Sequence, residues 1–119
     1  TLFDGNLSVV YNRKERKDHG ERGSFVGELP GPADRVVIVD DVMSSGGTKL
    51  EAIDLLANSL GVQVQGILVC VDRTPANFDL GRKGLRVESL VTLPDLIDHL
   101  AAEGDPRHQA MRDFYEGRI

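Results

Sequence analysis

The pattern of hydrophobic and polar positions divides the chain into short strands and amphipathic helices. Residues 7–11 are β-branched and aromatic, which predicts a strand. Residues 35–41 contain four consecutive β-branched positions without alternation, which is typical of a strand buried on both faces of a parallel sheet. Residues 62–72 predict a second buried strand, and both of these strands end in acidic residues.

A helical period lies between the two buried strands, and Gly61 is expected to end that helix. The apolar stripe of the helix holds Leu50, Ile53, Leu56, Ala57 and Leu60, and the opposite, polar side holds Lys49, Glu51, Asp54 and Asn58. A strand, loop, helix and strand in this order imply a right-handed crossover between parallel strands. The fold class is therefore α/β.

The C-terminal third continues the same alternation of elements. Residues 74–84 are expected to form a loop, and residues 87–93 a further strand. Pro94 suits the first turn of a helix that runs to about residue 102, and Pro106 begins a last helix that ends near Tyr115. We expect one domain over residues 1–119, with a mainly parallel sheet flanked by helices.

The composition of the chain indicates the cellular compartment in which the protein works. No apolar run approaches the ~20 residues that span a bilayer, and the first residues do not form a signal peptide. Cys70 is the single cysteine, so no intramolecular disulfide is possible, and its apolar neighbours predict a small buried side chain. We expect a cytoplasmic protein that does not bind membranes.

Basic residues are concentrated near the N-terminus. The formal net charge is −5, but residues 1–35 hold six basic and six acidic side chains, and five of the six bases lie within residues 13–22. Aromatic residues are 5% of the chain and Trp is absent, which disfavours nucleic-acid binding. Glycine and proline from Gly20 to Pro32 predict loop and turn here. A basic loop that meets a small polyanion is the favoured interpretation, and a merely solvated charged loop is the alternative.

Residues 44–48, Ser-Ser-Gly-Gly-Thr, follow the first buried strand and enter the helix. A glycine turn at a helix N-terminus offers backbone N–H groups and a positive dipole end to an anion, and the hydroxyl groups add donors. The spacing is not that of a Walker loop, because Lys49 follows Thr48 instead of preceding it. A phosphate monoester would fit, and the alternative is a turn that only caps the helix.

Asp40 and Asp41 end the strand directly before this turn. Two adjacent carboxylates at the end of a buried strand are costly unless a cation or hydroxyl groups meet them. Carboxylates that accept hydrogen bonds from two ribose hydroxyls, next to a loop that holds a 5′-phosphate, would together recognise a ribose 5-phosphate. A metal site of the receiver-domain kind is a weaker alternative.

Residues 36–48, VVIVDDVMSSGGT, resemble the phosphoribosyl-diphosphate (PRPP) signature of type I phosphoribosyltransferases at nearly every position. Residues 11–20, YNRKERKDHG, resemble the catalytic loop of the orotate branch of that family, whose pattern is R-K-E-x-K-x-H-G. Residues 71–73 match a strand-end arginine that contacts orotate in the same branch. The resemblance covers roughly residues 7–73 and implies a Rossmann-like phosphoribosyltransferase core.

The resemblance implies a role for each matched residue. Lys17 and Asp41 would be catalytic, with Lys17 assisting departure of diphosphate, and Ser44 and Arg73 would contact orotate. The PRPP-binding residues would be Arg13, Lys14, Lys17, His19, Asp40, Asp41, Val42, Met43, Ser44, Ser45, Gly46, Gly47 and Thr48. No residue would bind metal directly, because Mg²⁺ would accompany the diphosphate. A homodimer is implied, in which loop 13–23 reaches the neighbouring subunit's site.

The implied activity is that of orotate phosphoribosyltransferase, which makes orotidine 5′-monophosphate and diphosphate from PRPP and orotate in pyrimidine biosynthesis. The N-terminal hood segment of that family does not precede residue 7, so we expect either a C-terminal piece of a longer enzyme or a shortened protein. A non-catalytic PRPP- or nucleotide-binding regulatory module is the alternative function. His99 and His108 are expected at the surface, and Met43 beneath the glycine turn.

Overall fold

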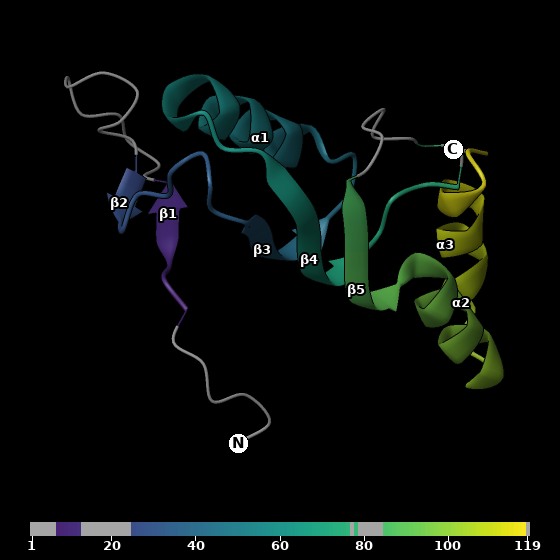
Figure 1. Cartoon of the computed structure of the whole chain (residues 1–119). Coiled ribbons are helices and arrows are strands. Elements are labelled where there is room, and N and C mark those ends of the chain that lie inside the picture. The colour runs from purple at the N-terminus through teal and green to yellow at the C-terminus, as the bar shows by residue number, and fades with distance from the viewer. Residues whose placement is uncertain (1–6, 13–24, 77, 79–84, 119) are drawn as a thin grey trace.

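Three parallel strands form the central sheet of the computed structural model, which describes residues 7–12, 25–76, 78 and 85–118. They are β3 (Val36–Met43), β4 (Val64–Asp72) and β5 (Arg86–Thr92), hydrogen-bonded in the order β3-β4-β5. The helix α1 (Gly47–Leu60) connects β3 to β4 (Figure 1). The predicted α/β class, with a parallel pair joined by a helical crossover, is confirmed.

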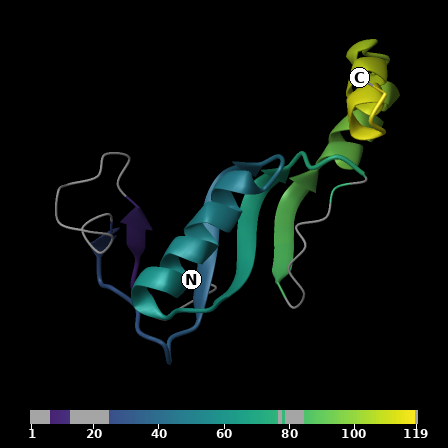
Figure 2. The same cartoon turned by 90° about the horizontal axis from the view of Figure 1, so that it is seen from above.

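One face of this sheet packs against α1, and we call it the covered face (Figure 2). Ile67 and Val69 of β4 are almost completely buried there, and Leu56 of α1 packs with Val64. Gly61 ends the helix with a φ of 66°, a left-handed conformation in which glycine carries no Cβ penalty. The end of the helix at Gly61 is confirmed, and of the predicted apolar stripe Leu50, Ile53, Leu56 and Leu60 are buried or half-buried, whereas Ala57 is exposed.

The opposite face, which we call the open face, is exposed in the part of the chain that the structure describes. Its side chains include Val37, Val39, Leu68 and Leu90, which are 53%, 71%, 43% and 77% exposed. The prediction that these strands are buried on both faces is therefore wrong for the described residues. Cys70, predicted to be buried, is also exposed. Side chains alternate between the faces of a strand, so only alternate positions contact the layer formed by α1.

A separate ladder precedes the sheet. The strand β1 (Val10–Asn12) pairs antiparallel with β2 (Phe25–Gly27). The strand predicted over residues 7–11 is thus shorter and begins later, and β2 lies in a segment predicted to be loop and turn. An added Cβ at Gly27, where φ is 118°, would lie 2.3 Å from the carbonyl oxygen of Val9, so this pairing needs glycine.

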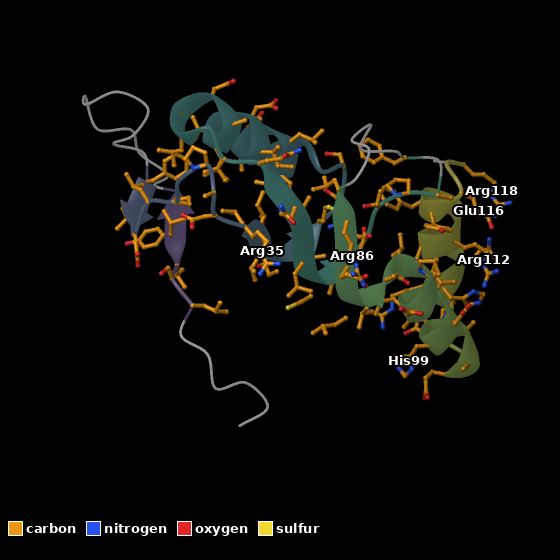
Figure 3. All side chains as sticks on the ribbon, viewed as in Figure 1. Arg35, Arg86, His99, Arg112, Glu116 and Arg118 are labelled. Carbon is orange, nitrogen blue, oxygen red and sulfur yellow. The ribbon has the colours of Figure 1, made fainter. Side chains whose placement is uncertain are left out.

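The helices α2 (Leu93–Ala102) and α3 (Arg107–Tyr115) pack together beyond β5 (Figure 1). A capping box begins α2, because Thr92 and Asp95 each bond to the other's backbone N–H. Both helices match the predicted ranges closely. The ends of α3 gather charged side chains, among them Arg112, Glu116 and Arg118, away from α1 (Figure 3).

The two C-terminal histidines differ. His99 is exposed on α2, as predicted. His108 is half-buried on α3, and its Nδ1 is buried with no hydrogen-bond partner among the described residues. His108 is therefore more buried than the predicted surface position, and one ring nitrogen is withdrawn from solvent.

Candidate functional site

The carboxyl ends of the three parallel strands meet at one edge of the sheet, where ligands of open α/β folds bind. Asp40 and Asp41 lie near this end of β3, and Asp72 ends β4. The backbone N–H of Arg73 donates to the carbonyl oxygen of Met43 at 2.8 Å, so the chain after β4 lies against the end of β3. Arg73 and Ser44 are the two predicted orotate residues. This contact places Arg73 beside Met43, the residue that precedes Ser44.

The glycine turn connects this edge to α1. Gly46 occupies the N-cap position with φ 78° and ψ 1°, and it provides no side-chain cap for the helix. The Oγ of Ser45 accepts a long hydrogen bond from the N–H of Gly47 at 3.4 Å. The first N–H groups of a helix have no intrahelical partners, so a turn of this kind can receive an anion. The predicted location of residues 44–48, at the entrance to a helix, is confirmed.

Met43 lies beneath the turn, as expected. Its side chain is 3% exposed and packs with Ile67 and Val69 in the core under the covered face. The turn is therefore anchored to the core on its strand side. Anchored backbone keeps an anion site preorganised, which lowers the entropic cost of binding.

The two carboxylates of the acidic pair are exposed, and each accepts the backbone N–H of the following residue. Asp40 Oδ1 accepts from the N–H of Asp41 at 2.8 Å, and Asp41 Oδ1 accepts from the N–H of Val42 at 2.8 Å. These bonds fix both carboxylates at the end of the strand. The predicted proximity of the acidic pair to the glycine turn is confirmed.

Lys49 is the residue that the sequence interpretation misplaced. It was predicted on the polar side of the helix, yet it is 7% exposed, and its Nζ donates to Asp40 Oδ2 at 2.5 Å and to the carbonyl oxygen of Val42 at 2.9 Å. Lys49 lies in the first turn of α1, so its long side chain extends back over the glycine turn to the end of β3. The signal in the sequence that could have predicted this contact is a lysine placed shortly after two acidic residues.

The Lys49 ammonium, as the largest cause, lowers the pKa of Asp40 from its ordinary value. The backbone N–H of Asp41 acts in the same direction. Hydrogen bonds to the charged form of a carboxyl group favour that form. Asp40 is therefore ionised at neutral pH and can accept hydrogen bonds from hydroxyl groups.

Hydrogen bonds within the chain order the turn that follows β4. Asp72 Oδ1 accepts hydrogen bonds from the N–H of Thr74 at 2.9 Å and from its hydroxyl group at 2.5 Å. Asp72 thereby orders the turn that carries the exposed Arg73. Of the predicted orotate contacts, the structure brings the backbone segments of Ser44 and Arg73 to the same edge of the sheet.

Four predicted diphosphate residues lie outside the described residues: Arg13, Lys14, Lys17 and His19. They belong to the segment that joins β1 to β2 in the chain. Because Asn12 pairs with Phe25, the two ends of this segment are held next to each other. Phe25 in turn packs against the core cluster that contains Leu56 and Val62, which ties this ladder to the covered face.

Among the described residues, no group of three or more His, Cys, Asp or Glu side chains could hold a metal ion. No helix within residues 7–12, 25–76 and 85–118 is long and apolar enough to cross a membrane.

Comparisons with known proteins agree with this geometry. The family model described as "Phosphoribosyl transferase domain" matches residues 2–78. The chain is 40% identical over 115 residues to the orotate phosphoribosyltransferase of Ralstonia nicotianae, covering 85% of this chain and 49% of that protein. It is 37% identical over 135 residues to the orotate phosphoribosyltransferase of Methylibium petroleiphilum, covering 92% and 56%.

A solved structure extends the agreement to three dimensions. The chain aligns with UMP synthase from Leishmania donovani with a TM-score of 0.68 and 32% identity, covering 95% of this chain and 24% of that one. The chain spans about half the length of the curated relatives it matches.

Proposed function

Because this chain belongs to the phosphoribosyl transferase domain family, we propose that it carries the PRPP site of an orotate phosphoribosyltransferase. The reaction transfers the phosphoribosyl group of PRPP to orotate and yields orotidine 5′-monophosphate and diphosphate, a step of pyrimidine biosynthesis. One observation carries the proposal: an acidic pair and an uncapped glycine turn lie consecutively at the carboxyl edge of a parallel sheet. The regulatory alternative is not favoured, because the named relatives are transferases.

The described residues supply the binding of the ribose 5-phosphate. Asp40 and Asp41 accept hydrogen bonds from the two ribose hydroxyls, and the turn from Ser44 to Thr48 receives the 5′-phosphate with its N–H and hydroxyl donors. With the sugar held at both ends, C1 is presented beyond the strand ends, toward Arg73. Orotate, an anion, meets the guanidinium of Arg73 and the hydroxyl of Ser44.

Breaking the bond between C1 and the diphosphate oxygen develops positive charge on the ribose and negative charge on the leaving group. The carboxylate of Asp41 stabilises the ribose side, and Lys17 neutralises the departing oxygen, with Arg13, Lys14 and His19 around the diphosphate. Mg²⁺ bound to the diphosphate supplies further charge neutralisation. This metal would be held through the diphosphate of the substrate, while Asp40 pairs with the Lys49 ammonium.

The assembly that we propose is a homodimer in the cytoplasm, in which loop 13–23 of one subunit reaches the site of its partner. Lys17 and Asp41 would then serve one site from two chains. Mixing the Lys17→Ala and Asp41→Asn variants, each inactive alone, should restore activity up to about a quarter of wild type, because mixed dimers contain one intact site. A mixture as inactive as its components would contradict sharing of the loop.

An orotate assay tests the function. The decrease in orotate absorbance is followed with PRPP and Mg²⁺, using this chain and, in parallel, the longest natural protein that contains it. Lys17→Ala should lower kcat by about a hundredfold or more while PRPP affinity changes little, because its charge acts on the leaving group. An unchanged kcat would remove Lys17 from catalysis, and no conversion of orotate by either protein would contradict the function.

A further inference from the structure

Lys49 occupies an unfavourable position for a lysine. It is the one charged residue that is buried among those the structure describes. Burial removes most of the hydration of an ammonium group, and the first turn of a helix repels a positive charge through the helix dipole. The cost of lost hydration would not apply on the solvated polar side on which the helical period would place it. Such a residue requires a compensating interaction.

The contacts of Lys49 show what compensates these costs. Its Nζ bridges Asp40 Oδ2 and the carbonyl oxygen of Val42. Both acceptors lie near the C-terminal end of β3, just before the glycine turn. Asp40 Oδ1 is held separately by the N–H of Asp41. Both oxygens of Asp40 therefore have fixed donors, and the carboxylate has one orientation.

The chemistry of the acidic pair, Asp40 and Asp41, explains why the Lys49–Asp40 contact matters. Two adjacent carboxylates repel each other, and an unassisted pair tends to keep one proton. A protonated carboxyl group donates one hydrogen bond and loses acceptor capacity, which suits a diol poorly. A fixed ammonium beside Asp40 favours the ionised form of that carboxyl group.

We propose that Lys49 is a positioning residue for PRPP binding, which holds Asp40 oriented and ionised so that the acidic pair accepts both ribose hydroxyls. Lys49 acts through Asp40 and does not itself contact the ligand, because its ammonium is directed to Asp40 and Val42. The proposal rests on the proposed function of the site. It adds a residue that lies outside the acidic pair and the turn.

Calorimetric titration of PRPP with Mg²⁺ measures the effect. Lys49→Met should weaken PRPP binding by about tenfold or more, because the acidic pair loses its counter-ion. Lys49→Arg should recover part of the affinity. The matched control is Arg86→Met, which removes one positive charge and the exposed Arg86–Glu88 ion pair on β5 (Figure 3). Wild-type affinity in Lys49→Met, or an equal loss in Arg86→Met, would overturn the proposal.

The pH profile separates positioning from a purely structural role. The charged groups that contact Asp40 are Lys49 of α1 and Asp41 of β3, and the neighbouring strand β4 ends in Asp72, which is followed by Arg73. Without Lys49, Asp40 takes up a proton at higher pH, so as the pH is lowered PRPP affinity in Lys49→Met should begin to fall at higher pH than in wild type. A variant with weaker binding but an unmoved profile would contradict the proposal.

A measurement without ligand keeps the proposal separate from the proposed function. Carboxyl carbon-13 NMR should give Asp40 a pKa below the ordinary value of about 3.9 in wild type, and Lys49→Met should raise it toward that value. If Lys49→Met does not fold, the NMR signals of the Lys49 side chain in wild type should shift as the Asp40 carboxyl takes up its proton. Lys49 signals that do not respond to protonation of Asp40 would overturn the proposal. Absence of PRPP binding by wild type would contradict the function alone.

Discussion

The covered and open faces of the sheet both carry aliphatic side chains, but these side chains lie in very different environments. On the covered face, Ile67 is 1% exposed and packs beside Met43 and Val69. On the open face, Val39 and Leu90 are 71% and 77% exposed. The difference does not come from the strands, since both faces carry β-branched and aliphatic side chains. It comes from the layer that α1 supplies to one face.

The ion pairs differ between the two faces in the same way. Lys49 reaches Asp40 from α1, so the charge that accompanies the acidic pair comes from the helix that covers the sheet. The only ion pair that the structure shows on β5 of the open face, Arg86 with Glu88, is 80% and 57% exposed and lies in water. The contribution of an ion pair to stability therefore depends on the layer that excludes water from it. Screening by solvent limits the contribution of the exposed Arg86–Glu88 pair to at most about 1 kcal/mol.

Thiol reactivity should give the largest contrast between the faces. Cys70 lies on the exposed side of β4 and should react with a thiol reagent at nearly the rate of the unfolded chain. In the Val69→Cys/Cys70→Ala variant the thiol takes a buried position, and reaction should be slower by about a thousandfold, because it waits for opening of the fold.

Equal protection of the two positions would contradict this comparison. It would show that the open face is covered in solution, and the same assay at several protein concentrations would test whether a second copy covers it. Protection by a second copy should weaken on dilution.

Truncation of side chains should give the next largest contrast. Ile67→Ala should lower the free energy of unfolding by about 2–5 kcal/mol, because it leaves a cavity in the core. Leu90→Ala removes a side chain of similar size from the open face and should change it by less than about 0.5 kcal/mol. Urea unfolding with matched m-values measures both variants, and a loss at Leu90 comparable to that at Ile67 would break the comparison.

The ion pairs should give the smallest contrast in stability. Asp40→Asn leaves the buried Lys49 ammonium without its partner and should cost about 1–2 kcal/mol at neutral pH, a value reduced because Asp40 is 45% exposed. Adding Lys49→Met should recover most of this loss. Glu88→Gln, the control on the open face, should change stability by less than about 0.5 kcal/mol.

The lowered pKa of Asp40 gives the sign of the pH dependence. The stabilisation from this carboxylate is present above its unfolded pKa of about 3.9 and is lost as the pH falls through the lower, folded value. The stabilities of wild type and Asp40→Asn should therefore converge as the pH falls below the folded pKa of Asp40. A difference that persists after Asp40 is protonated would mean that the charge of Asp40 is not responsible.

Local patterns in the sequence were enough to predict the elements that position the site. The β-branched run before Asp40, the glycine turn and the apolar stripe of α1 each combine a periodicity with an end signal. These features depend on neighbours in the chain, so β3, α1, β4 and the edge they share could be predicted. Met43 was expected beneath the turn because it directly precedes Ser44 in the chain.

The remaining features depend on contacts between elements. Lys49 looked solvent-exposed because the helical period ignores the strand end that its side chain reaches. Cys70 looked buried because an apolar run indicates what a strand can bury and not which layer covers it. The strand from Phe25 to Gly27 is only three residues long and is surrounded by turn signals, so its pairing with β1 was not visible in the pattern.

The central claim is that the acidic pair and the glycine turn bind PRPP, and calorimetry of the Asp40→Asn/Asp41→Asn variant tests it most directly. The titration uses PRPP with Mg²⁺, and ribose 5-phosphate as a second ligand that lacks diphosphate. We predict that wild type binds both ligands and that the variant, with its fold verified by circular dichroism, loses at least about a hundredfold in affinity for each, because two charged hydrogen-bond acceptors are removed. Wild-type affinity in the folded variant would contradict the account.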